Sequence, residues 1–103
     1  MFKINPDPTF RASVALSVPG NDTPATIAVD FKHLAKSALR DYFGNLEGKS
    51  DAEALGFIVT GWSGVDKDYS AEALALLLDN YPSAAGELFN AYRRELLEAG
   101  RKN

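Results

Sequence analysis

The chain has 103 residues, of which 46% are hydrophobic and 24% are charged, and these are the proportions of a globular protein. This length predicts a single domain over residues 1–103 with a core of its own. The formal net charge of −3 argues against binding to nucleic acid, which needs a basic surface. The absence of cysteine excludes disulfides, thiolate catalysis and cysteine-based metal sites.

The sequence does not predict a membrane location. No apolar run approaches the roughly 18 residues of a membrane span, and residues 1–10 lack the apolar centre of a signal peptide. We therefore expect the protein to stay in the cytoplasm of the cell that makes it.

The first third of the chain shows the alternating pattern of β-strands. In residues 10–18 and again in residues 26–33, apolar side chains alternate with polar or small ones, which predicts one buried face for each strand. A cluster of turn-forming residues, 19–24, separates the two segments. Together they predict an antiparallel hairpin, and its apolar face must pack against other elements because an isolated hairpin is marginal in water.

Two amphipathic helices are predicted next. The first carries an apolar stripe from Ala35 to Leu46. The second begins at Ser50, because Ser50 and Glu53 have the spacing of a capping box. Glycines at positions 61 and 64 are expected to close this second helix. Its apolar stripe is predicted to comprise Ala54, Leu55, Ile58, Val59 and Trp62.

A third and a fourth helix are predicted on either side of Pro82. Ser70 is expected to cap the third helix, and Glu72 places an acid in its first turn, where the helix dipole favours negative charge. Pro82 ends this helix because proline disfavours helical geometry in the residue before it. The fourth helix is expected to run to about Gly100, followed by two basic residues. The predicted fold is therefore α+β, an N-terminal antiparallel β-hairpin followed by about four amphipathic helices.

The loop before the third helix raises the question of a calcium site. Oxygen-bearing side chains recur there at a spacing of two, as they do in an EF-hand: Asp66, Asp68, Ser70 and Glu72. Counted from Asp66, however, the loop has alanine where an EF-hand needs glycine, and Leu77 where it needs the closing glutamate. We interpret Ser70 as a helix cap and the aspartates as solvated loop residues. A calcium-responsive module is the alternative.

No group of residues predicts an enzyme. His33 is the only histidine, and no nucleophile-elbow motif accompanies it. Zinc would need more nitrogen or sulfur ligands than the chain offers, and a glycine-rich phosphate loop is absent. We therefore interpret His33 as structural and expect no catalytic residue, metal or cofactor.

Aromatic residues in the second half of the chain are candidates for a contact surface. At helical spacing such residues belong to a core more often than to a surface. Several small amphipathic helices nevertheless expose more apolar stripe than a small core covers, so part of it is expected to face a partner or a second copy. Aromatic residues carry much of the binding energy at such surfaces. The candidate partner-binding residues are Trp62, Tyr69, Tyr81, Phe89 and Tyr92.

A set of short motifs spans nearly the whole chain. They are residues 1–10, Phe31-Lys32-His33, Gly61-Trp62 with Val65-Asp66, Tyr69-Ser70, Leu77-Leu78, Asn80-Tyr81-Pro82, and Ala91-Tyr92 through residues 101–103. Together they resemble a family of small phage tail assembly chaperones, similar in role to those of lambda-like long-tailed phages. These motifs are typical of a fold and not of a catalytic site.

The resemblance implies a role in the host cytoplasm. Such a chaperone binds the long, helical tape measure protein, keeps it soluble, helps to recruit tail tube protein around it, and is absent from the finished virion. The family brings no cofactor and no catalytic residue, and reversible self-association suits the role, so we expect a non-enzymatic homo-oligomer. The alternatives are a structural virion component, such as a tail completion or connector protein, and a small helical adaptor.

Overall fold

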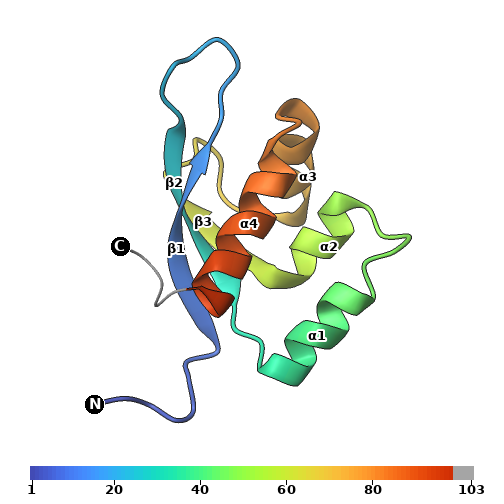
Figure 1. Cartoon of the computed structure of the whole chain (residues 1–103). Coiled ribbons are helices and arrows are strands. Elements are labelled where there is room, and N and C mark those ends of the chain that lie inside the picture. The colour runs from blue at the N-terminus through green and yellow to red at the C-terminus, as the bar shows by residue number, and fades with distance from the viewer. Residues whose placement is uncertain (99–103) are drawn as a thin grey trace.

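Three strands and four helices make up the fold over residues 1–98, the part of the chain that this computed structural model describes (Figure 1). The predicted α+β class, with a hairpin ahead of four helices, is confirmed. The elements in chain order are β1 (Thr9–Leu16), β2 (Ala25–Lys32), α1 (Lys36–Gly44), α2 (Asp51–Ile58), β3 (Val59–Ser63), α3 (Ala71–Asn80) and α4 (Ala84–Leu97).

The predicted hairpin supplies two strands of a three-stranded antiparallel sheet in the order β1-β2-β3, with β2 at its centre. Val14 lies opposite Ile27, and Ala12 lies opposite Val29. All four side chains are buried on one face of the sheet, as the alternation of apolar and polar residues predicted.

The second predicted helix is shorter than expected, and the segment that was predicted to be its last part forms the strand β3 instead. α2 ends at Ile58, and β3 pairs with β2 on the side away from β1. The prediction that Val59 and Trp62 lie on a helical stripe was therefore wrong. The prediction that Gly61 and Gly64 close a helix was also wrong, because Gly61 lies within β3 and Gly64 follows it. The β-branched Val59 and Thr60 are stiff and fit a pleated strand. Pairing with β2 satisfies backbone groups that a further helical turn would otherwise have bonded.

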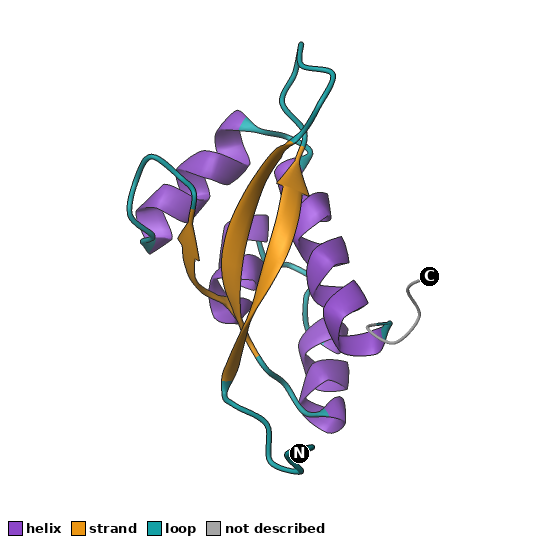
Figure 2. Ribbon diagram, turned by 90° about the vertical axis from the view of Figure 1, so that its left-hand side faces the viewer, coloured by secondary structure: helices purple, strands orange, loops and turns teal. Residues whose placement is uncertain are grey.

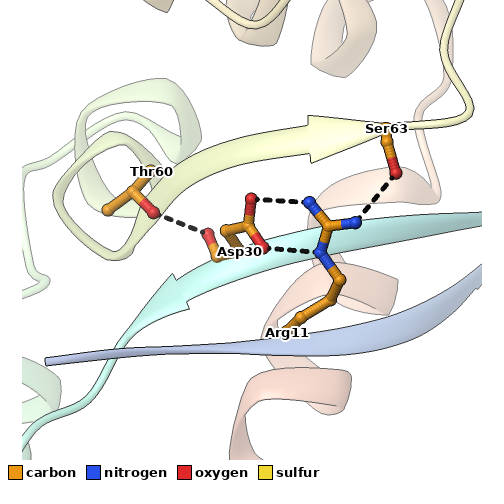
Figure 3. Close-up of polar contacts among 4 residues, drawn as sticks. All are labelled: Arg11, Asp30, Thr60 and Ser63. Carbon is orange, nitrogen blue, oxygen red and sulfur yellow. Dashed lines mark hydrogen bonds and ion pairs between the residues drawn. The ribbon is translucent and has the colours of Figure 1, made fainter. Parts of the chain in front are cut away.

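An ion pair on the outer face of the sheet joins the three strands (Figure 3). The Arg11 guanidinium on β1 donates to both carboxylate oxygens of Asp30 on β2, at 2.8 and 3.1 Å, and to Ser63 Oγ on β3 at 3.3 Å. The hydrogen bond from Arg11 holds the pKa of Asp30 below its usual value. Thr60 Oγ1 donates to the Asp30 carbonyl at a β-bulge, 3.2 Å away. Gly61 leaves room for this arrangement, because a Cβ there would lie 3.1 Å from Asp30 Oδ2.

All four helices lie on one side of the sheet, and both views of the chain show this arrangement (Figures 1 and 2). α4 packs along β1, while α2 contacts α3, α4, β2 and β3. None of the helices within residues 1–98 has the length and apolar character needed to cross a membrane. The largest fully buried side chains come from both layers: Val14, Val29, Phe31, Leu55, Ile58, Leu74, Leu88 and Tyr92.

The helix starts that the sequence predicted are confirmed by their caps. Ser50 Oγ accepts a hydrogen bond from the Glu53 amide at 3.1 Å, and the Glu53 carboxylate accepts one from the Ser50 amide at 2.9 Å, which completes the capping box. Ser70 Oγ accepts from the Ala73 amide at 3.0 Å and caps α3. α4 ends at Leu97, and the predicted extension to Gly100 with basic residues 101 and 102 lies outside the described residues.

The capping box at the start of α2 generates a stability prediction. We expect Ser50→Ala to lower the free energy of unfolding by about 1 kcal/mol, because it removes the acceptor of a first-turn amide. Chemical denaturation followed by circular dichroism measures this change. Ser83→Ala is a matched control, since Ser83 is the N-cap of α4 but its side chain makes no capping hydrogen bond. Equal losses in the two variants would contradict the assignment of the capping role to Ser50.

Candidate functional site

Three of the five predicted contact residues gather at one corner of the molecule. Trp62 lies in β3, Tyr69 in the loop that follows, and Tyr81 directly after α3. All three side chains are partly buried. The rings of Trp62 and Tyr69 meet edge to face with their centroids 5.0 Å apart, and Trp62 and Tyr81 line the same surface groove.

The corner is held by hydrogen bonds between aromatic side chains and backbone carbonyls. Trp62 Nε1 donates to the Lys67 carbonyl at 2.8 Å, and the Tyr69 hydroxyl donates to the Val59 carbonyl at 3.0 Å. Gly64, with a φ of +86°, makes the turn that brings the loop back toward β3. The loop is therefore folded around Trp62, and its aromatic residues have fixed positions in the surface.

The two predicted residues on α4 occupy different environments. Tyr92 is 0% exposed, and its ring lies against Phe31, with the centroids 5.1 Å apart. Its hydroxyl donates to the Lys32 carbonyl at 2.8 Å. Phe89 is partly buried and packs against the core. We therefore leave Tyr92 out of the candidate surface, and Phe89 is not among the residues that line the groove at the corner.

An elongated apolar groove runs beside α3 and is named here the α3 groove. Two adjoining depressions of about 300 and 240 Å³ form it, and they share Val65, Asp66, Leu77 and Tyr81. One depression extends to Leu76 on α3, whose side chain is 49% exposed. The other extends to the hairpin strands. The apolar residues that line the groove from end to end include Leu16, Ile27, Val65, Leu76, Leu77 and Tyr81, with Trp62 beside them.

The acidic loop behaves as the helix corner that the sequence analysis favoured. Ser70, the third residue in the proposed ligand series, uses its hydroxyl to cap α3. Asp66 and Asp68 are exposed. Over residues 1–98, no three acidic or histidine side chains are grouped closely enough to hold a metal ion.

His33 has structural contacts that link the two ends of the hairpin. Its backbone amide donates to the Pro8 carbonyl at 2.9 Å. Its ring lies edge-on to Phe10, with the centroids 6.3 Å apart. These contacts agree with the interpretation of His33 as a structural residue.

A separate depression of about 410 Å³ lies between α1 and α2 and is named here the α1–α2 pocket. Its apolar lining comprises Leu34, Ala38, Tyr42, Leu46, Ala54 and Phe57. Phe57 is 50% exposed, its ring stacks on Tyr42 with the centroids 5.7 Å apart, and the Lys32 ammonium lies 3.9 Å from the ring centroid. The Tyr42 hydroxyl donates to the Ala54 carbonyl at 2.6 Å. Sequence reasoning missed this pocket, although Phe57 was a signal, because it is a large apolar residue off the predicted stripe.

The buried tyrosines generate a pH prediction. Burial raises the pKa of Tyr42 to about 12 from its ordinary value of 10.0 and also raises the pKa of Tyr92. The folded chain therefore keeps protons that the unfolded chain releases. We expect the contribution of these tyrosines to stability to be constant below about pH 9 and to fall between pH 10 and about 12. Thermal denaturation across this range measures the fall, and Tyr92→Phe should reduce its slope. An unchanged slope in that variant would contradict the contribution of Tyr92.

Comparison with known families gives one match. A family model described as phage tail assembly chaperone matches residues 1–103, which is the whole chain. Neither the curated proteins nor the solved structures contain a match to this chain. The family agrees with the resemblance carried by the sequence motifs.

Proposed function

The chain belongs to the phage tail assembly chaperone family, and from this premise we propose that it binds the tape measure protein in the host cytoplasm and assists assembly of the tail tube around it. We propose the α3 groove as the binding surface, with Trp62 and Tyr81 in its lining and Tyr69 beside Trp62. The role is non-enzymatic. It consists of covering apolar helical surface until the tail is assembled.

The spacing of the residues that line the α3 groove is the observation that carries this proposal. Four of them follow one another on α3 at i, i+3, i+4 and i+7, the spacing of one helical face: Ala73, Leu76, Leu77 and Asn80. A second helix laid beside this face would pack as a neighbouring helix does in a bundle. A long helical protein with apolar stripes offers that kind of partner.

The aromatic corner supplies anchors for such a helix. Trp62 and Tyr81 are the residue types that contribute most when an interface excludes water. The Trp62 side chain is fixed by its hydrogen bond to the loop, so little of its freedom is lost on binding. Asp66 and Lys67 stand at the polar rim of the groove, where charges favour the register of a partner more than its affinity.

We further propose that the protein self-associates and also contacts tail tube protein. The support is that the apolar surface is divided between the α3 groove and the α1–α2 pocket, which have no lining residue in common. One surface remains free for a second copy or a tube subunit while the other holds the tape measure protein.

Co-expression with the tape measure protein from the same genome tests the proposal. We expect the tape measure protein to become soluble and to co-purify with this chain, because its apolar stripes are covered. A tape measure protein that stays insoluble while this chain elutes alone would refute the proposed activity. Recovery of this chain from purified virions by mass spectrometry would instead favour the structural-component alternative.

A charge placed in the α3 groove tests the site. We expect Leu76→Lys to weaken co-purification by about tenfold or more, because it buries an unpaired ammonium in the interface. Its melting temperature should change little, since the Leu76 side chain is half-exposed on a helix. The matched control is Leu97→Lys on α4, where the leucine is 59% exposed outside the groove.

Retention of full binding by Leu76→Lys would move the site away from the α3 groove.

Trp62→Ala separates the two possible roles of Trp62 in the aromatic corner, contact with the partner and packing in the core. If Trp62 is a contact, the variant binds the tape measure protein more weakly and stays folded. A variant that only unfolds would make Trp62 a core residue and remove it from the site.

A further inference from the structure

The segment ahead of β1 exposes three large apolar side chains. In this N-terminal arm, residues 1–8, Met1 is fully exposed, Phe2 is 91% exposed and Ile4 is 87% exposed. A single exposed apolar residue is ordinary on a protein surface. Three within four positions form a patch that is costly to leave in water, and such patches mark interaction sites.

The arm is held in place at the end that joins β1, and it projects away from the helices of its own chain. The Pro8 carbonyl accepts a hydrogen bond from the His33 amide at 2.9 Å, and Lys3 pairs with Asp7 at 2.5 Å. In Figure 1 the N-terminus lies to the lower left of the sheet, whereas α1 and α2 lie to its right. Phe2 and Ile4 are thus presented to a neighbouring molecule.

The α1–α2 pocket has a size and a lining that suit such side chains. Its volume of about 410 Å³ lies within the range of about 300–1,000 Å³ in which pockets bury small apolar groups. Asp41 and Glu53 stand at its edge together with Lys49. The arm brings Lys3, whose pair with Asp7 is exposed on both sides and therefore weak, so Lys3 can turn to Asp41 or Glu53 at the edge of the pocket.

We propose that Phe2 and Ile4 of one copy dock in the α1–α2 pocket of a second copy. The seven residues before Pro8 span at most about 25 Å when extended, which is enough to reach the pocket of an adjoining molecule. Reciprocal exchange closes a dimer, whereas one-way exchange builds a larger assembly. This contact rests on the self-association proposed above and names the surfaces that would carry it. Binding of the tape measure protein is proposed for the separate α3 groove, so either contact can fail without the other.

Engineered disulfides test the contact directly, because the natural chain has no cysteine. Phe2→Cys and Ala38→Cys are made in separate full-length chains with different tags, mixed and oxidised. Ala38 is exposed and lines the pocket. We expect a covalent dimer that carries both tags. The control pairs Phe2→Cys with Leu97→Cys, an exposed position elsewhere, and should yield far less dimer.

The same two substitutions in one chain separate exchange from self-docking. If the arm enters a second copy, oxidation gives covalent dimers and larger species. A monomer with an internal disulfide would show that the arm folds back into its own pocket, and this result would overturn the proposal.

Sedimentation of the natural chain and of the double variant Phe2→Ser/Ile4→Ser measures the contribution of the arm. We expect self-association to weaken by at least about tenfold in the variant. The melting temperature of the monomer should stay the same, because both side chains lie outside the core. A natural chain that is monomeric at every concentration, or a variant that associates as strongly as the natural chain, would overturn the proposal. The tape measure protein is absent from both experiments, so their outcome is independent of the proposed binding to that protein.

Discussion

The burial of a single face of the sheet is the constraint on which the rest of the structure depends. With all four helices on one side (Figure 1), every large apolar side chain of the core must meet in one layer. Tyr92 lies at the centre of that layer. Its ring contacts the strands through Phe10 and Phe31 and approaches Tyr42 of α1, with a centroid distance of 6.4 Å. Its hydroxyl bonds the Lys32 carbonyl at the end of β2, so the helical layer is tied to the sheet by both packing and a hydrogen bond.

The features of the fold that were predictable from the sequence are those decided by neighbouring residues. The capping box of Ser50 and Glu53 needs only four consecutive residues, and the hairpin needs only alternation and a turn. β3 was not predictable in this way, since it depends on pairing with β2, about thirty residues earlier. The run Ile58-Val59-Thr60 was a local signal for extended backbone, but the apolar spacing there also fitted a helix.

The candidate surface was predictable in part for a similar reason. Trp62 and Tyr69 lie together because the loop after β3 folds back on itself, and Tyr81 follows the end of α3, whose start Ser70 caps as predicted. The sequence pattern named these aromatic residues but did not indicate that they meet. Helical spacing placed Tyr92 on an apolar stripe but did not indicate that the sheet covers this stripe. The same limit explains why the α1–α2 pocket was missed. A stripe shows that a face is apolar, and only the packing of the helices shows which part of it stays open.

The position of α2 separates the two open surfaces, the α3 groove and the α1–α2 pocket. α2 packs against α3 on one side and forms the α1–α2 pocket with α1 on the other. Occupation of the pocket therefore leaves the α3 groove accessible. A groove that holds one or two turns of a helix binds weakly on its own. Much of the favourable contact free energy is offset by the translational and conformational freedom that is lost on binding. Copies joined through their arms would present several α3 grooves to one long helical partner, and linked weak sites bind far more strongly than single ones. Under this proposal, binding would stay reversible at each groove, so assembling tail subunits would displace the chaperone one copy at a time.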